Sequence, residues 1–375
     1  MNVIVFVLRG CPAGWLGAYG NEWVATPNLD RLAAESVVFD RHISECPTPE
    51  AAHAAWLPHG PPPGSVLIRA NHPETDSPPE FYAGWGEVFD ARPQEGDASP
   101  LDELLRTLPR VLERDAPVVW IEIDRLLPPW DVSQDVFEAY IADEDEEIEK
   151  IEPLADPELG SFDTSDAAAW EWLHASFAAV VTSLDAELGA AFELLRERGL
   201  DKSATWVVSS DYGLPLGEHG IIGPDGSELH EELVHVPLIV RNPDAADAGR
   251  RATDMTRPGS LKESLLARRA HEVVVSRMGG SAAVRTEQWA LIVPAEGSLK
   301  LYTKPDDRWE VHDVASMHED VVQELTERGA SAPCADGGGR PPPLGMLHSI
   351  PRAGHLFGPH DLVELLAGEH AGAIL

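Results

Sequence analysis

The side chains best suited to chemistry stand directly after apolar runs of the sequence. Asp211 and Tyr212 follow the run at residues 204–208, and Arg9 follows the run at residues 2–8. Both runs have the character of buried strands, and ligands of open α/β sheets bind beyond the carboxyl ends of strands. Arg9 and Asp211 therefore each stand at the end of a predicted strand, and we expect a ligand-binding edge of the sheet at Asp211.

Nucleophilic groups gather in the segment Cys46-Pro47-Thr48-Pro49-Glu50. The Cys46 thiol and the Thr48 hydroxyl could each attack an ester, but an unassisted hydroxyl needs a base or a metal to accept its proton. His53 follows little more than one helical turn later, and His219 lies in the glycine-rich stretch after Asp211. His219 is either a site residue or a hydrogen-bond partner within a loop.

Two other patterns each allow a purely structural explanation. His230 and His235 flank two glutamates but are five positions apart, so they do not share the helical face that a zinc motif requires. Asp124 and Asp131 flank a Pro-Pro-Trp turn after another apolar run. They either contact a ligand or cap that turn.

The elements that must hold these groups alternate between strands and helices. Short apolar, β-branched runs predict buried strands, at residues 2–8, 37–39, 65–69, 117–123, 204–208 and 236–240. Helical spacing lies between many of them, at residues 27–33, 51–57, 101–113 and 166–198. This alternation predicts an α/β fold, a three-layer sandwich with a central, mostly parallel sheet.

The chain divides into three parts. Residues 1–256 form the predicted N-terminal α/β domain. Short strands predicted at 283–285, 290–293 and 299–302 favour a small C-terminal α+β subdomain over residues 257–330. Residues 331–375 are rich in Gly, Pro and His without periodicity, which predicts a poorly ordered tail.

The formal net charge of −36 over 375 residues limits the partners. Nucleic acid and anionic membranes are disfavoured, because each phosphate contact would meet a negative field. Three widely spaced cysteines give neither a disulfide framework nor a thiolate zinc site. No stretch reaches the roughly 20 apolar residues of a membrane span, and the N-terminus lacks the basic start of a signal peptide. We expect a cytoplasmic protein, with the acidic run at 143–149 in solvent.

Four blocks of sequence resemble the sulfatase family of the alkaline phosphatase superfamily. The blocks are Leu16-Gly17-Ala18-Tyr19-Gly20 with Thr26-Pro27-Asn28-Leu29; Asp185 with Gly189; Ser210-Asp211-Tyr212-Gly213 with Gly217-Glu218-His219-Gly220, Glu231-Glu232 and residues 236–240; and Arg285-Thr286 with Leu301-Tyr302. Their order and spacing, over about residues 2–325, make the resemblance specific. It implies the fold predicted above, hydrolysis of sulfate or phosphate esters, and a small anionic ester as the partner.

The resemblance also implies a divalent cation, usually calcium, held by hard oxygen ligands. The family places two consecutive acids after the first strand, where this chain has Arg9 and Gly10. It places an Asp with an Asn or His after the later strand, where this chain has Asp211 and Tyr212. With Asp211 as the one remaining ligand, we expect calcium to be absent or weakly bound.

This chain also departs from the catalytic motifs of the family. The family's nucleophile is a Cys or Ser in C/S-x-P-x-R, but residues 46–50 lack the arginine, so conversion to formylglycine is not expected. A family lysine that would bind the ester oxygen is replaced at residues 223–226, which read Gly-Pro-Asp-Gly. If hydrolysis occurs, Thr48 or Cys46 would attack, Arg9 would stabilise the developing charge and Asp211 would orient, with His219 as a further candidate catalytic residue. Arg9, His53 and Asp124 would then bind the substrate.

The sequence leaves three hypotheses open. In the first, the chain is a sulfatase-family protein with weak or lost activity, and an Arg9–Asp211 salt bridge fills the former metal site. In the second, it is a non-catalytic anion-binding or scaffold protein, and Arg9 holds an anion in the same cleft. In the third, a working hydrolase draws its metal ligands from Asp124, Asp131 and Asp211.

Overall fold

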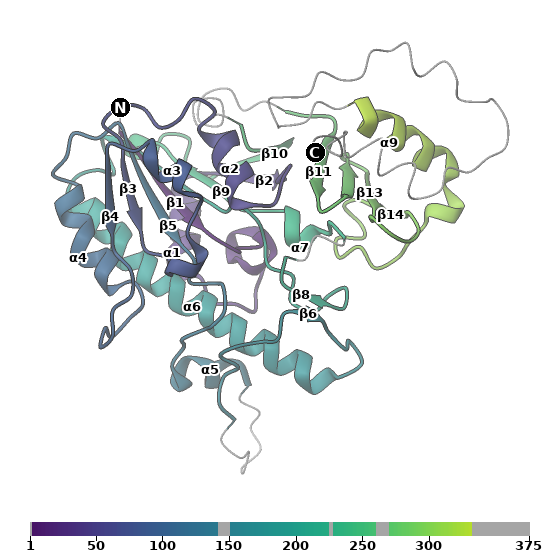
Figure 1. The fold of residues 1–375 in the computed structure, drawn as a ribbon, viewed down its shortest axis with the longest axis horizontal. Helices are drawn as coiled ribbons and strands as arrows, with labels where there is room; N and C mark the ends of the chain where they lie inside the picture. The colour runs from purple at the N-terminus through teal and green to yellow at the C-terminus, as the bar shows by residue number, and fades with distance from the viewer. Residues whose placement is uncertain (1, 142–150, 225–227, 260–269, 332–375) are drawn as a thin grey trace, which may run out of the picture.

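The computed structural model describes residues 2–141, 151–224, 228–259 and 270–331, and it is built around one large sheet (Figure 1). In spatial order the eight strands are β10 (Arg250–Thr256), β2 (Val37–His42), β9 (Leu238–Arg241), β7 (Ala204–Ser209), β1 (Asn2–Leu8), β5 (Val118–Ile123), β3 (Val66–Arg69) and β4 (Glu87–Asp90). All neighbours pair in parallel except β9, which is antiparallel to β2 and β7. The sheet is thus mostly parallel, as predicted.

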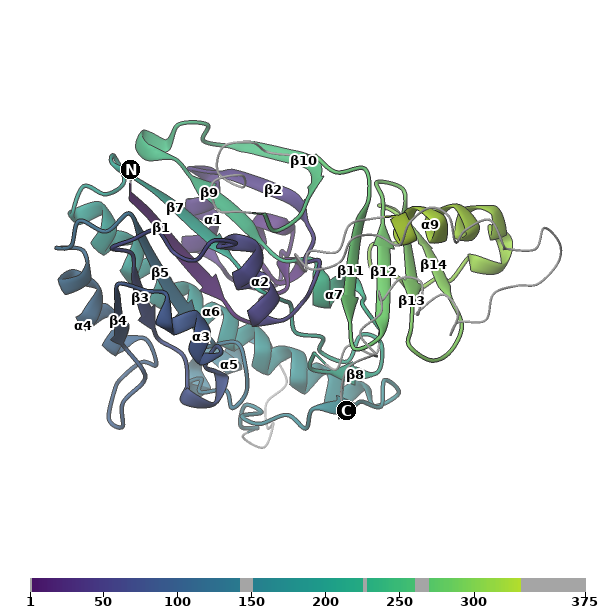
Figure 2. The ribbon, with the colours of Figure 1, turned by 45° about the horizontal axis from the view of Figure 1, so that its top comes forward.

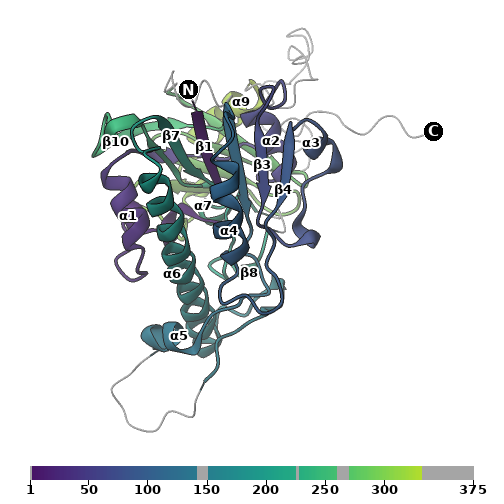
Figure 3. The same ribbon diagram turned by 90° about the vertical axis from the view of Figure 1, so that its left-hand side faces the viewer.

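Helices cover both faces of this sheet. One face carries α1 (Pro27–Ala34), α4 (Asp102–Val111) and the long α6 (Ala167–Glu197), whose far end packs on α5 (Gln134–Ile141). The other face carries α2 (Pro49–Trp56) and α3 (Pro79–Ala83). Figure 3 shows α1 and α6 on the opposite side of the strands from α2 and α3. The three-layer sandwich predicted from the sequence is confirmed.

The strand β1 shows why the layers form. Its alternate side chains, Ile4, Phe6 and Leu8, belong to the core beneath α1, α4 and α6. Val3, Val5 and Val7 belong to the core beneath α2 and α3. A central parallel strand is buried on both faces, so it is apolar at successive positions instead of alternating with polar ones.

A second, antiparallel sheet follows in the chain. It has the order β11 (Val274–Met278), β12 (Ser281–Arg285), β13 (Trp289–Val293) and β14 (Lys300–Thr303), and α9 (Glu319–Ser331) packs on it. Figure 2 shows this sheet beside the large one, with α9 at its outer end. The predicted C-terminal α+β region is present. The chain changes sheets between Thr256 and Val274.

Shorter elements connect these layers. They are β6 (Gly160–Ser161), β8 (Ile221–Ile222), α7 (Glu231–Val234) and 3-10 turns at Ala13–Trp15, Gly17–Tyr19, Pro73–Thr75, Pro243–Ala245 and Ala315–Met317. Among the described residues, no helix combines the length and apolar character needed to cross a bilayer. The acidic run 143–149 and the predicted tail beyond residue 331 lie outside the described residues.

Candidate functional site

The site predicted at the strand ends lies where β1, β5 and β7 run side by side. β1 pairs with β5 on one flank and with β7 on the other, so their carboxyl ends share one edge. The pairing continues beyond the strands through a parallel bridge between Gly10 and Gly213. Arg9 and Asp211 are thereby placed next to each other, and the Glu122 side chain joins them from β5.

Arg9 occupies the centre of this group and is only 2% exposed. Its Nε donates to Asp211 Oδ2 at 3.0 Å, and its Nη2 lies 3.1 Å from Ser77 Oγ and 3.4 Å from Glu122 Oε1. Its Nη1 donates to the backbone carbonyl of Thr75. Every nitrogen of the guanidinium therefore has an oxygen partner inside the protein, and the expected Arg9–Asp211 pair is present.

Glu122 is the second carboxylate of the group, and it is 1% exposed. Its Oε1 accepts from Ser77 Oγ at 3.0 Å, and its Oε2 accepts from the Tyr82 hydroxyl at 3.1 Å. His53 Nε2 lies 3.1 Å from Oε1 without in-line hydrogen-bond geometry. The His53 ring stacks on Phe81 with 3.8 Å between centroids, which closes the group toward α3.

Opposite charges stabilise one another in this group. Burial alone would lower the pKa of the Arg9 guanidinium, but Asp211 and Glu122 outweigh it and hold that pKa above its ordinary value. Burial opposes ionisation of Glu122, yet His53 and Arg9 bring the pKa of its carboxyl below the usual range. For Asp211, burial exceeds the attraction of Arg9 and raises the pKa. The 3.0 Å contact with Arg9 Nε nevertheless argues that Asp211 is ionised at neutral pH.

These residues do not fit the calcium ion that the resemblance implies. A hard cation needs about six to eight oxygen ligands, and here a guanidinium takes the two carboxylates and two further oxygens. Gly10 has φ +78°, and a Cβ there would lie 2.6 Å from Leu127 Cδ2, so an acid at this position would displace Leu127. Among the described residues, no three His, Cys, Asp or Glu side chains are grouped to hold a metal ion.

The Tyr212 side chain lies in a hydrophobic core and not beside Arg9 and Asp211. Its ring packs with Ile43, Leu229 and Leu233 in the core under the second sheet. Burial raises the pKa of its hydroxyl well above the ordinary value, so the group is neutral. Gly213 is required beside it, because a Cβ would lie 2.0 Å from the backbone oxygen of Glu232. A ligand-like position in the sequence has thus become a packing position.

The predicted nucleophiles stand in a separate loop. Thr48 is the N-cap of α2 and its Oγ1 accepts from Ala51 N at 3.4 Å. Cys46 is half-buried two positions earlier. The loop approaches the strand ends through Ser44, whose Oγ donates to the Asp211 carbonyl at 3.1 Å. Among the described residues, no hydrogen bond or ion pair connects Thr48 to Arg9 or Asp211.

Asp124 stabilises the loop whose Thr75 carbonyl contacts Arg9. Its Oδ2 accepts from His72 N at 2.8 Å and from the Thr75 hydroxyl. This holds the Thr75 carbonyl against Arg9 Nη1. Asp131 is exposed, and its backbone carbonyl accepts from Arg125 Nη2. Among the described residues, no hydrogen bond or ion pair joins either carboxylate to Asp211.

Comparison with known proteins agrees with this architecture. The sequence model described as Sulfatase matches residues 69–261, which is more than half of the chain. The chain belongs to the sulfatase family.

Individual relatives are distant from this sulfatase-family chain. Human arylsulfatase D is 36% identical over 56 residues, which are 15% of this chain and 9% of that relative. The phosphonate monoester hydrolase of Agrobacterium radiobacter superposes with a TM-score of 0.64 at 16% identity, over 87% of this chain and 94% of the other. A protein solved in complex with its substrate D-glucosamine-2-N,6-O-disulfate superposes with a TM-score of 0.62 at 15% identity, over 87% and 97% of the chains. At these identities the solved structures establish the fold.

The family motifs that this chain keeps serve packing. Asp185 caps α1 by accepting from Asn28 N at 3.0 Å and Leu29 N at 2.8 Å. Gly189, one turn later, lets Asn28 approach, because a Cβ there would lie 2.5 Å from the Asn28 side chain. The Tyr19 hydroxyl accepts from Leu238 N at 2.8 Å and so ties the first block to β9.

His219, the last predicted catalytic residue, belongs to a different buried cluster. Its ring stacks on His230 with 3.6 Å between centroids, and its Nε2 lies 3.4 Å from Glu232 Oε1. Burial lowers the pKa of His219 to about 4, so it is neutral at pH 7. His219, Glu228, His230 and Glu232 line a small pocket beside Pro215.

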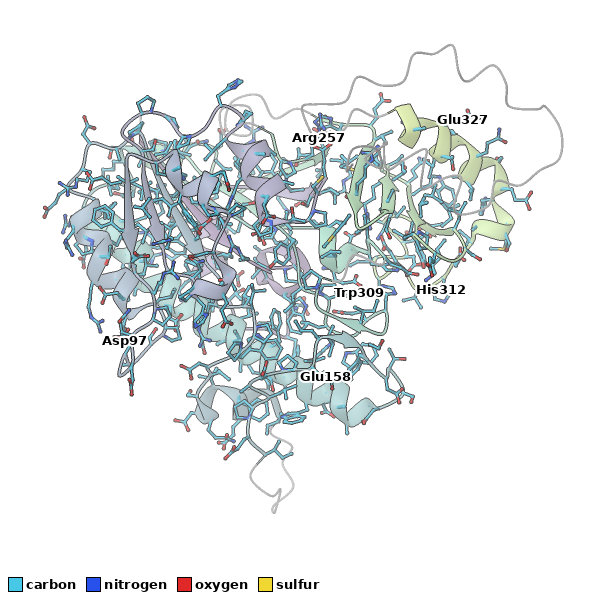
Figure 4. All side chains as sticks on the ribbon, viewed as in Figure 1. Asp97, Glu158, Arg257, Trp309, His312 and Glu327 are labelled. Carbon is cyan, nitrogen blue, oxygen red and sulfur yellow. The ribbon has the colours of Figure 1, made fainter. Side chains whose placement is uncertain are left out.

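Ionic contacts extend this His219 cluster to the second sheet. His230 lies between Glu228 and Glu310, at 2.7 Å from each. Glu310 also accepts from Arg285 and Lys304 at 3.0 Å. Glu310 stands on the loop that carries Trp309 and His312, labelled in Figure 4, and is itself only 1% exposed.

Sequence analysis therefore identified part of the cluster around Arg9. It identified Arg9, His53 and Asp211, which the fold brings together. It missed Ser77, Tyr82 and Glu122. Glu122 carried a signal, because it is the acid inside an otherwise apolar strand, and a buried carboxylate needs a partner. Ser77 lies in the loop before α3 and Tyr82 lies within that short helix, and neither gave a comparable signal.

Proposed function

We propose that this protein is a sulfatase-family member in which ester hydrolysis is weak or lost, and that its strand-end site is now a structural ion cluster. The single observation that carries the proposal is the Arg9 guanidinium, shared between Asp211 and Glu122 at the position where the family has acids. This charge inversion removes a metal ligand and supplies a fixed cation in the same step.

The same contacts argue against hydrolysis by the chain's own residues. Stabilising an ester's developing negative charge requires donors aimed at open space, whereas the nitrogens of Arg9 already point at protein oxygens. Thr48 would need a base to accept its proton. The hydroxyl oxygen of Thr48 instead accepts the cap hydrogen bond of α2.

A second proposal is that the same strand-end site binds a small anion without turnover. A structural relative that was solved with a sulfated sugar as its substrate suggests this kind of ligand. The basic side chains of Arg9 and His53, which both lie beside Glu122, favour it. The full pairing of Arg9 with two carboxylates weighs against it, because an anion would have to displace Glu122 or Asp211. We therefore place it after the structural proposal.

Metal content and turnover of the purified full chain test the first proposal. We expect substoichiometric calcium by elemental analysis, and hydrolysis of aryl sulfate, phosphate and phosphonate esters no faster than with a Thr48→Ala/Cys46→Ala variant. Stoichiometric metal that is lost in Asp211→Ala, together with turnover, would overturn it. A rise in melting temperature with sulfate or phosphate that Arg9→Ala abolishes would favour the anion-binding proposal.

A further inference from the structure

Four oxygen atoms from separate parts of the chain surround the Arg9 guanidinium. They are Asp211 Oδ2 after β7, Glu122 Oε1 within β5, and Ser77 Oγ and the Thr75 carbonyl from the loop after β3. We name these atoms the guanidinium site. Two of them carry formal negative charge, and the side chains of Asp211, Glu122 and Ser77 are at most 3% exposed.

The site is held in place by bonds that do not involve Arg9. The Tyr82 hydroxyl lies 3.1 Å from Glu122 Oε2, and Ser77 Oγ donates to Glu122 Oε1 at 3.0 Å. Asp211 Oδ1 accepts from Tyr212 N at 3.0 Å. Asp124 accepts from the Thr75 hydroxyl and so fixes the backbone of that loop. The oxygens should therefore keep their positions when the Arg9 side chain is shortened.

The site suits a planar guanidinium. A guanidinium presents five N–H donors in a fixed fork, and its weak hydration lowers the cost of burial. The donors of Arg9 point in several directions, with Nε toward Asp211 and Nη2 toward Ser77 and Glu122. Without any cation the two carboxylates would be buried and unpaired, which proteins avoid.

We infer that the Arg9 side chain is the covalently tethered occupant of a cation-binding site, and that this site binds a free small guanidinium-type cation once the side chain is removed. The inference does not depend on whether the native protein hydrolyses esters. It assigns a binding role to Glu122, Ser77 and the Thr75 carbonyl, and it treats the loop after β3 as one wall of the site.

Chemical rescue of Arg9→Ala in the full chain tests the inference. We expect this variant to melt below the native protein, and millimolar guanidinium or methylguanidinium chloride to raise its melting temperature by about 2 °C or more. The same salts, compared with equal concentrations of sodium chloride, should not raise the melting temperature of the native chain, where Arg9 fills the site.

Two variants serve as controls. Leu188→Ala removes a fully buried apolar side chain from α6, so it should be destabilised without any guanidinium response. Arg9→Ala/Glu122→Gln removes one carboxylate from the site, so its guanidinium response should be smaller than that of Arg9→Ala. If Arg9→Ala does not fold on expression, its yield on refolding from urea with and without guanidinium replaces the melting assay.

The outcomes separate clearly. A guanidinium response in melting or refolding that is seen only in variants lacking Arg9, and that is smaller in Arg9→Ala/Glu122→Gln, supports the inference. No response in either assay overturns it, and so does an equal response in Leu188→Ala. Stabilisation of Arg9→Ala by calcium chloride but not by guanidinium also overturns it, since the oxygens would then prefer a spherical ion. Turnover by the native protein would contradict the proposed function and leave this result unaffected.

Discussion

His230 Nδ1 lies 2.7 Å from Glu310 Oε2. This contact joins the start of α7, which belongs to the domain of the large sheet, to the loop that follows β14 of the second sheet. Glu310 adopts φ 55°, an unfavourable backbone angle for a residue with a side chain. Its carboxylate also contacts Arg285 and Lys304. The two sheets are thus joined by one buried carboxylate that satisfies three cationic groups.

Replacing Glu310 should weaken the whole protein. In Glu310→Gln the amide keeps the size but loses the charge, so Arg285, Lys304 and His230 are left with excess positive charge in a buried place. We expect a loss of about 3 kcal/mol in the free energy of unfolding by urea. Glu324→Gln, which touches an exposed pair with Arg328 on α9, is the matched control and should change stability by less than about 0.5 kcal/mol. Equal effects in both variants would contradict this role of Glu310.

The same cluster predicts how stability depends on pH. Burial would lower the pKa of His230, but hydrogen bonds with Glu228 and Glu310 raise it overall to about 9. A raised folded-state pKa means that this stabilisation is complete below about pH 6.5 and is lost as pH rises through about 9. Burial beside Glu218 raises the pKa of Glu232 to about 8, so ionising this carboxyl also destabilises the folded state as pH rises from about 4.5 to 8.

Urea unfolding between pH 5 and 9 checks this direction. We expect the free energy of unfolding to fall across that range by about 3 kcal/mol or more, with both groups contributing. Glu232→Gln cannot ionise, so its curve should be flatter than the native one between pH 5 and 8. A native curve that rises toward pH 9 would show that His230 is not held as a cation by Glu228 and Glu310.

Sequence patterns predicted the interior of the fold better than its edges. The strands β1, β5 and β7 are continuous apolar runs because both of their faces are buried, and that signal needs no knowledge of neighbours. The strands β4 and β10 lie at the two edges of the sheet. Their sequences, Glu87–Asp90 and Arg250–Thr256, are largely polar and exposed, as edge strands that avoid further pairing often are. Such strands lack the periodicity that a sequence analysis uses.

The candidate site likewise has features that the sequence could predict and features that it could not. The pairing of Arg9 with Asp211 could be predicted, because the resemblance to sulfatases places both residues at the positions of the family's metal ligands. The separation of His219 from Arg9 could not, because it depends on His219 stacking against His230 from α7. The role of Tyr82 depends on a turn of α3 whose position no pattern in the sequence indicates.

The Asp185–Gly189 motif gives a prediction about packing. Asp185 accepts from Asn28 N and Leu29 N at the start of α1, and burial raises the pKa of its carboxyl. Asp185→Ala should cost about 1–3 kcal/mol, because two backbone N–H groups lose their acceptor. Gly189→Ala should also destabilise, since its Cβ would lie 2.5 Å from Asn28. Thermal unfolding measures both, with Gly60→Ala as a strain-only control, because nothing lies near its Cβ although its φ is +74°. Gly189 lies inside α6 and has no positive φ, so a Gly189→Ala variant as stable as the native protein would contradict the role of the Asn28 contact.

Glu122 should matter to stability as much as a residue of the apolar core. In Glu122→Gln the single amide oxygen can accept from Ser77 or from Tyr82 but not from both, and the side chain no longer balances the charge of Arg9. We expect a loss of about 3–5 kcal/mol in the free energy of unfolding, the range for breaking a buried ion pair. Glu158→Gln, at an exposed position labelled in Figure 4, should change it by less than about 0.5 kcal/mol. Because burial alone would favour neutral Glu122, a variant as stable as the native protein would mean that Glu122 is protonated and that Arg9 is balanced by Asp211 alone.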